Sequence, residues 1–104
     1  MEKNLNRKVT AIVQARINSS RFPGKILHKI NGKSVIEIIV KRLKKCKNIK
    51  SIIVAIPKNI ENKSLEIHLK NKKINYFKGE EQNVLKRFLD VSKKYRIKHI
   101  LRVT

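Results

Sequence analysis

The hydrophobic positions of this chain follow two alternating patterns, one typical of buried strands and one typical of helices. Short, nearly continuous apolar runs predict strands covered on both faces at residues 8–14, 51–56, 74–77 and 97–103. Apolar residues at helical spacing predict helices between them at residues 34–46, 62–72 and 80–95. Because strands alternate with helices, the pattern predicts an α/β fold with right-handed crossovers. Helices should cover both faces of one doubly wound, mainly parallel sheet.

Local residues predict several element boundaries. Ser34, followed three residues later by Glu37, is typical of a capping box at the start of the first helix. The apolar segment before it, residues 26–30, is expected to end in an Asn31-Gly32 turn. Five apolar residues of the last helix are expected to face the core: Val84, Leu85, Phe88, Leu89 and Val91.

A basic loop follows the first predicted strand, at the carboxyl end of the sheet, where ligands bind in folds of this kind. Arg16, Arg21 and Lys25 occur within ten residues, and the segment 11–36 contains no acidic residue. Arginine makes forked contacts to phosphate oxygens, and lysine adds a compact point charge. The loop therefore predicts a site for a multiply charged anion. The alternative is a solvated basic loop in a lysine-rich chain.

The same loop also offers neutral hydrogen-bond donors. Ser19 and Ser20 carry hydroxyl groups, and Gly24 permits close approach of the backbone. Free backbone N–H groups in a tight loop form anion-binding concavities. The pattern is neither the Walker loop GxxxxGK[ST] nor the dinucleotide pattern GxGxxG, so a nucleotide would be bound in another way.

The net charge of +20 raises the question of a nucleic-acid partner. Lysine greatly outnumbers arginine, and the lysines are spread along the whole chain. Lys, Asn and Ile share AT-rich codons, so we interpret much of this charge as a consequence of genome composition. Aromatic residues make up only 5% of the chain, too few for the stacking platforms of single-strand binders. These features argue against nucleic acid as the main partner.

The length of 104 residues corresponds to one domain or part of one. No apolar run reaches the roughly 18 to 20 residues of a membrane span, and we expect no membrane association. The N-terminus shows no secretory signal. A single cysteine, Cys46, cannot form an internal disulfide, which fits the cytoplasm.

The side chains that could bind a metal show no ligand spacing, so the sequence predicts no metal site within the chain. The histidines are scattered: His28, His68 and His99. Three acidic residues are expected on helix surfaces: Glu61, Glu66 and Asp90.

The loop resembles the N-terminal signature of the sugar cytidylyltransferases, A-R-x-x-S-x-R-x-P-G-K-x-L. The matching residues are Ala15, Arg16, Ser19, Arg21, Pro23, Gly24, Lys25 and Leu27. Gln14 is typical of the spore-coat polysaccharide branch, whereas the acidic-sugar branch more often has proline there. Further along, GEEQNVLKRF (residues 79–88) resembles the family segment G-x-E-x-D-V-L-x-R-[FY]. ILRVT (residues 100–104) resembles the strand that leads to R-V-T-G-D.

This resemblance implies a glycosyltransferase-A-like, Rossmann-like nucleotidyltransferase fold and a reaction. A sugar hydroxyl attacks the α-phosphate of CTP, pyrophosphate leaves, and Mg²⁺ assists, in the synthesis of cell-surface or spore-coat polysaccharides. Carried over residue by residue, the catalytic cations would be Arg16, Arg21 and Lys25. The nucleotide-binding residues would be Gln14, Ala15, Arg16, Ser19, Ser20, Arg21, Gly24, Lys25, Arg102 and Thr104.

The resemblance also implies that part of the family pattern is missing. The family continues after Thr104 with Gly-Asp, and that aspartate holds the metal. Residues 1–104 are therefore expected to form the nucleotide-binding N-terminal part of a domain truncated after its fourth strand. Such a part would lack the Mg²⁺ ligands and would be inactive alone. Its exposed sheet edge could pair with a second copy, as a homo-oligomer.

Two alternatives remain from the sequence. One is a small basic module that binds nucleic acid through its phosphates. The other is a non-catalytic remnant that depends on a partner chain for the missing half.

Overall fold

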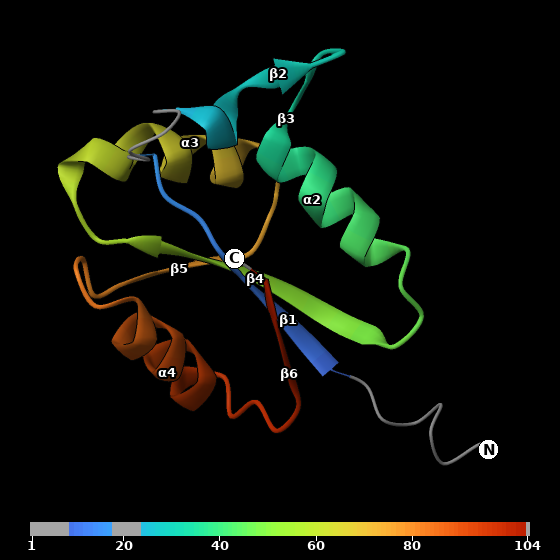
Figure 1. Cartoon of the computed structure of the whole chain (residues 1–104), viewed down its shortest axis with the longest axis vertical. Coiled ribbons are helices and arrows are strands. Elements are labelled where there is room, and N and C mark those ends of the chain that lie inside the picture. The colour runs from blue at the N-terminus through green and yellow to red at the C-terminus, as the bar shows by residue number, and fades with distance from the viewer. Residues whose placement is uncertain (1–8, 18–23, 104) are drawn as a thin grey trace.

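A computed structural model describes residues 9–17 and 24–103 and shows a four-stranded parallel sheet (Figure 1). The strand order is β5-β4-β1-β6, and every neighbouring pair is parallel. The strands are β1 (Val9–Gln14), β4 (Ile49–Pro57), β5 (Tyr76–Gly79) and β6 (Ile100–Val103). The predicted α/β fold is confirmed, and the two most apolar runs, β1 and β4, occupy the centre of the sheet.

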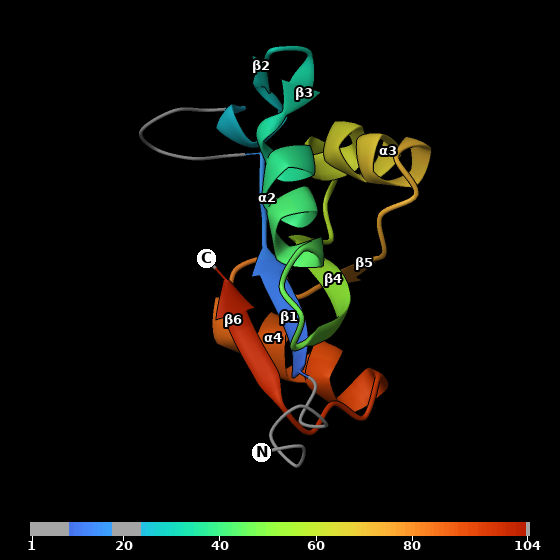
Figure 2. The same ribbon diagram turned by 90° about the vertical axis from the view of Figure 1, so that its right-hand side faces the viewer.

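Helices cover both faces of this sheet. The helices are α2 (Val35–Lys44), α3 (Lys63–Asn71) and α4 (Val84–Lys94), with short 3-10 turns η1 (Lys25–Leu27) and η2 (Ile60–Asn62). α2 and α3 lie on one face, and α4 lies on the other (Figure 1). A small antiparallel hairpin, β2 (Lys29–Ile30) and β3 (Lys33–Ser34), precedes α2. Figure 2 shows β6 beside β1 at one edge of the sheet. No helix in the described ranges is long and apolar enough to cross a membrane.

The core consists of two layers, one on each side of the sheet. On one side, Val13 and Val54 pack with residues of α2 and α3, among them Ile36 and Leu69. On the other side, buried residues of β1 and β4 pack against Val91 of α4. Successive strand residues point to opposite faces, so covering both faces requires a nearly continuous apolar run. This is why β1 and β4 lack the polar alternation of a half-exposed strand.

Several boundaries differ from those expected. The segment 26–30 contains a 3-10 turn and the first strand of the hairpin. Its Asn31-Gly32 turn is confirmed, since both residues have positive φ, of 53° and 83°. Strand β5, predicted at residues 74–77, begins at Tyr76. The last helix begins at residue 84 rather than 80, because the Asn83 side chain accepts a hydrogen bond from the Lys86 N–H at 3.0 Å and caps it.

The predicted core face of α4 is partly wrong. Val84, Leu85 and Leu89 are 39%, 61% and 50% exposed, whereas Val91 is buried. Phe88 packs partly against the core. The apolar residues lie on one side of this helix, as the periodicity predicts, but the helix is turned so that only one edge of that side, with Phe88 and Val91, faces the sheet. The helix instead turns Arg87 inward, and polar contacts described below fix that orientation.

The expectation that Glu66 lies on a helix surface is also wrong. Glu66 is 8% exposed, and it accepts hydrogen bonds from the Tyr76 hydroxyl at 2.9 Å and the Lys78 ammonium at 3.4 Å. The bond from Tyr76 is the main cause that lowers the pKa of Glu66, and the same bond raises the pKa of Tyr76. The carboxylate therefore links α3 to β5.

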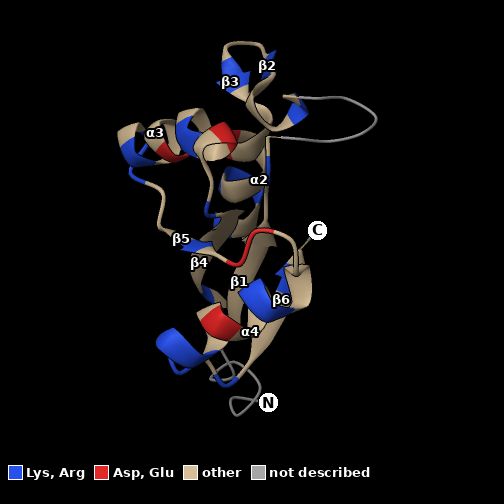
Figure 3. Ribbon diagram, turned by 90° about the vertical axis from the view of Figure 1, so that its left-hand side faces the viewer, with Lys and Arg blue, Asp and Glu red and all other residues tan. Residues whose placement is uncertain are grey.

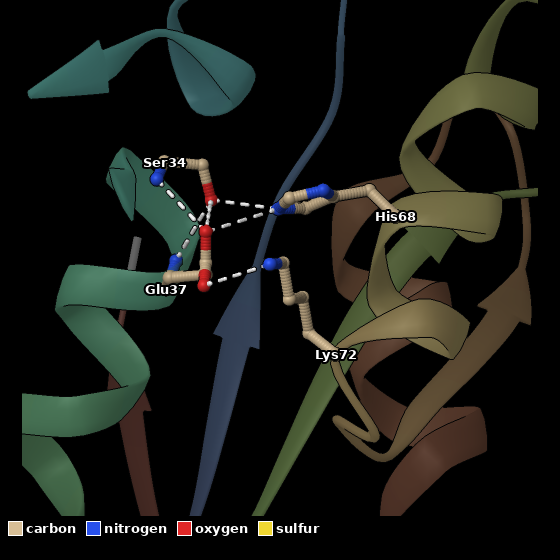
Figure 4. A network of polar contacts seen from close by, with 4 residues as sticks. All are labelled: Ser34, Glu37, His68 and Lys72. Carbon is tan, nitrogen blue, oxygen red and sulfur yellow. Dashed lines mark hydrogen bonds and ion pairs between the residues drawn. The ribbon is translucent and has the colours of Figure 1, made fainter. Parts of the chain in front are cut away.

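The predicted capping box of α2 is confirmed and extends to α3 (Figure 4). The Glu37 N–H donates to Ser34 Oγ at 3.2 Å, and the Ser34 N–H donates to Glu37 Oε1 at 2.9 Å. His68 Nε2 lies 2.7 Å from Ser34 Oγ, and Lys72 Nζ lies 3.7 Å from Glu37 Oε2. These four side chains hold the start of α2 against α3.

We expect this network to make stability fall in acid. The hydrogen bond from the Ser34 backbone is the main cause that lowers the pKa of Glu37, with Lys72 and His68 adding to it. Because the folded pKa lies below the unfolded one, the stabilisation is present above about pH 4.5 and disappears as pH falls through the folded pKa. Chemical denaturation at several pH values should show a steeper loss below pH 4.5 in the native protein than in Glu37→Gln. Equal pH dependence of the two proteins would contradict this.

Candidate functional site

A cavity of about 260 Å³ lies at the carboxyl end of β1, bordered by the end of β6 and by α2. Ligands bind at this end of open parallel sheets. Its lining residues are Val13, Gln14, Ala15, Arg16, Lys25, Ile26, Val35, Ile39 and Val103. Two larger cavities, of about 340 and 360 Å³, lie around the amino ends of the strands, the first beside Lys50 and Ile74 and the second beside Thr10 and Tyr95. Their position does not match the usual ligand-binding end.

Four of the predicted site residues meet at this cavity. Gln14 is the last residue of β1, Ala15 and Arg16 follow it directly, and Lys25 is the first residue of η1. Arg16 and Lys25 are exposed, and the rest of the lining is mainly apolar. The cavity therefore combines a partly apolar wall with two cations at its mouth, an arrangement suited to a ligand with a planar part and an anionic part.

Hydrogen bonds hold both ends of the basic loop. The Ala15 N–H donates to the carbonyl of Ala55 at 3.0 Å, and the Ile17 N–H donates to Asn62 Oδ1 at 2.7 Å. The Gly24 N–H donates to the Ile17 carbonyl at 2.8 Å, which brings Lys25 close to the end of β1. Gly24 has a φ of 78°, a conformation that favours glycine.

The other predicted site residues are placed differently or lie elsewhere. Ser19, Ser20, Arg21 and Thr104 lie outside the described residues. Arg102 was expected to border the cleft, but its guanidinium lies 5.8 Å from the centre of the Phe88 ring, on the α4 side of the sheet. Adjacent strand residues face opposite sides, so its neighbour Val103 reaches the cavity instead.

Arg87 is a site residue that sequence reasoning missed. This side chain of α4 is 1% exposed, and its Nε donates to Gln14 Oε1 at 3.0 Å. One of its terminal nitrogens donates to the carbonyls of Glu80 at 2.6 Å and Glu81 at 3.4 Å. Burial lowers the pKa of Arg87, and the positive charge of Arg16 lowers it further, while Glu80 opposes both. The family-like segment at residues 79–88 contains this arginine, and that was the signal available in the sequence.

Gly79 makes room for the buried arginine. A Cβ at this position would lie 2.8 Å from Cγ of Arg87 and 2.8 Å from Cε2 of Phe77. At that distance, both the middle of the arginine side chain and the aromatic ring would have to move, at a substantial cost in free energy. A glycine is therefore required at the end of β5 if Arg87 is to reach Gln14.

Asn62 is the second residue that was missed. It is 2% exposed and lies at the start of α3, where its amide holds Ile17. Its own Nδ2 donates to Asn59 Oδ1 at 2.7 Å, which fixes the orientation of the amide. The position of the basic loop therefore depends on a side chain 45 residues away in sequence.

No three His, Cys, Asp or Glu side chains of the described residues gather in a way that could hold a metal ion. Glu80 and Glu81, whose backbone carbonyls accept hydrogen bonds from Arg87, are exposed. The described residues thus do not provide a set of Mg²⁺ ligands, and we derive no chemical step through a metal.

Comparison with known proteins identifies the family. The cytidylyltransferase family model matches residues 10–104. The chain belongs to the cytidylyltransferases. An uncharacterised protein of Methanocaldococcus jannaschii is 37% identical over 97 residues, which is 93% of this chain and 40% of that protein. The spore coat polysaccharide biosynthesis protein SpsF of Bacillus subtilis is 30% identical over 97 residues, 89% of this chain and 40% of SpsF.

The solved structure of a cytidylyltransferase from Leptospira borgpetersenii superposes with a TM-score of 0.85 at 29% identity. The match covers 95% of this chain and 42% of that structure. This cytidylyltransferase chain thus spans about two fifths of the length of its relatives. Within that span, the family match includes the strand end, the basic loop and Arg87.

Proposed function

We propose that this chain binds CTP in the cavity at the end of β1 and is the nucleotide-binding part of a sugar cytidylyltransferase. The observation that carries the proposal is the meeting of Arg16, Lys25 and Gln14 at one partly apolar cavity, at the ligand-binding end of the sheet, in a chain of this family. The similarity to SpsF supports a role in cell-surface or spore-coat polysaccharide synthesis.

In the proposed reaction, a hydroxyl oxygen of the sugar forms a bond to the α-phosphorus of CTP. The bond from that phosphorus to the bridging oxygen breaks, pyrophosphate leaves with the electron pair, and the hydroxyl proton is released. Arg16, Arg21 and Lys25 would stabilise the negative charge that accumulates on the phosphates and the leaving pyrophosphate. Such preorganised cations are the largest contribution of protein groups in phosphoryl-type transfer.

The sugar site and the Mg²⁺ ligands would belong to the part of the family fold that this chain does not span. The relatives are longer by more than a factor of two, since the chain covers 40% of two of them. When bound, Mg²⁺ would neutralise phosphate charge beside the cations of the loop. The residues described here would bind and orient the nucleotide.

The proposal is tested by calorimetric titration of the purified protein with CTP, and separately with a mixed-sequence duplex and a single-stranded oligonucleotide. We expect saturable CTP binding with a stoichiometry of one. The lysines and arginines are spread over strands, helices and loops (Figure 3), so any nucleic-acid binding should be weak and fall steeply with salt. Tight oligonucleotide binding without CTP binding would support the basic nucleic-acid module instead and overturn the proposal.

A further inference from the structure

Arg87 is a buried cation whose partners are all neutral. Its hydrogen bonds go to the Gln14 side-chain oxygen and to the backbone carbonyls of Glu80 and Glu81. In the described ranges, no carboxylate lies within 4.0 Å of it to form an ion pair. Burying a charge without an opposite charge is costly, and here Arg16 adds repulsion. An anion bound beside Arg16 would relieve both costs.

Gln14 is held in one orientation by this arginine. Its Oε1 accepts from Arg87 Nε at 3.0 Å, so the amide nitrogen Nε2 must point away from the guanidinium. Nε2 is buried and finds no hydrogen-bond partner among the described residues. Buried donors without a partner are rare and cost about 1–3 kcal/mol each. An unused donor on a residue that lines the cavity indicates that a ligand acceptor belongs there.

We propose that Arg87 is a positioning residue for the nucleotide: it fixes the Gln14 carboxamide so that Nε2 donates to an acceptor atom of the ligand, and its unpaired charge helps Arg16 and Lys25 attract the phosphates. This inference rests on the proposed binding of CTP in the cavity. A nucleoside triphosphate supplies both missing partners, because it carries acceptor atoms on its base and a chain of negative charges.

The test compares CTP affinity and thermal unfolding in Arg87→Met, with Arg42→Met as the control. Arg42 is an exposed arginine on α2. Replacing Arg87 by methionine removes the cost of the buried charge, but it also leaves Gln14 Oε1 and the carbonyls of Glu80 and Glu81 without their donor. We expect Arg87→Met to unfold at a lower temperature than the native protein and, under conditions where it is folded, to bind CTP about tenfold more weakly, a loss typical of one charge-assisted contact. A folded Arg87→Met protein with native CTP affinity would overturn the proposal.

The variant Gln14→Glu tests the same proposal independently, and it can be used even if Arg87→Met does not fold. The new carboxylate can still accept from Arg87 Nε and supplies the anion that the guanidinium lacks, but the Nε2 donor is gone. We expect a higher unfolding temperature and at least tenfold weaker CTP binding. A more stable protein with unchanged CTP affinity would show that Gln14 and Arg87 only hold the fold together, against the proposal.

Two further comparisons show which part of the nucleotide carries the acceptor atom, and whether a negative result concerns this inference or the proposed function. The uncharged variant Gln14→Met is titrated with inorganic triphosphate as well as with CTP. Weakened CTP binding with unchanged triphosphate binding places the acceptor on the nucleoside, and weakening of both places it on the phosphates. If native protein binds CTP and Lys25→Ala weakens it, while the Arg87 and Gln14 variants do not, this inference fails and the proposed function stands. If native protein binds no CTP, both fail.

Discussion

Replacing Arg16 or Lys25 by alanine will weaken CTP binding about 10- to 100-fold, because each cation is expected to make a charge-assisted hydrogen bond worth about 1.5–3 kcal/mol. Both side chains line the cavity, and both are exposed, so little in the fold depends on them. Calorimetric titration measures the affinity, and thermal unfolding should show nearly unchanged stability for both variants.

Exposed cations elsewhere provide matched controls for this result. Arg42→Ala on α2 and Lys70→Ala on α3 remove the same charges from exposed positions away from the cavity. We expect their CTP affinities to stay within about twofold of native, because isolated surface charges are screened by salt. Similar losses in all four variants would mean that the total charge of +20, and not the loop, attracts the nucleotide.

Leu69→Ala should lower the free energy of unfolding by about 2–5 kcal/mol, the range for removing a fully buried leucine side chain. Leu69 is 0% exposed on α3, in the layer of the core between the sheet and helices α2 and α3. For a chain of this size the loss is a large fraction of total stability. Urea denaturation followed by circular dichroism measures it.

Ile67→Ala on the same helix is the control for that substitution. Ile67 is 48% exposed, so its removal should cost less than about 1 kcal/mol. If Ile67→Ala destabilises the protein as much as Leu69→Ala, α3 does not pack on the sheet through the face described here.

The parts of the fold that sequence predicted correctly depend on contiguous residues. The capping box of α2 needs only Ser34 and Glu37, and the central strands follow from apolar runs of a few residues. The wrong face of α4 has a physical reason as well. The apolar residues at 84, 85 and 89 satisfy helical spacing, but the polar contacts of Arg87 orient the helix. A pattern of hydrophobic positions cannot reveal those contacts.

The candidate site was likewise predictable only where it is local. Gln14, Ala15, Arg16 and Lys25 lie within one short segment, and the structure brings them to one cavity. Arg87 and Asn62 act across 73 and 45 residues, and their roles follow from the strand order and the packing of α3 and α4. Glu66 became buried for the same reason, since Tyr76 and Lys78 reach it only in the folded sheet.

The central claim is that this chain holds CTP at the carboxyl end of β1, and a crystal structure of the protein with CTP tests it most directly. The account predicts phosphate oxygens within hydrogen-bonding distance of Arg16 and Lys25, and a ligand acceptor within that distance of Gln14 Nε2. CTP bound instead at the amino ends of the strands, beside Lys50 and Asn75, would contradict it. So would an unchanged, empty cavity in crystals grown at saturating CTP.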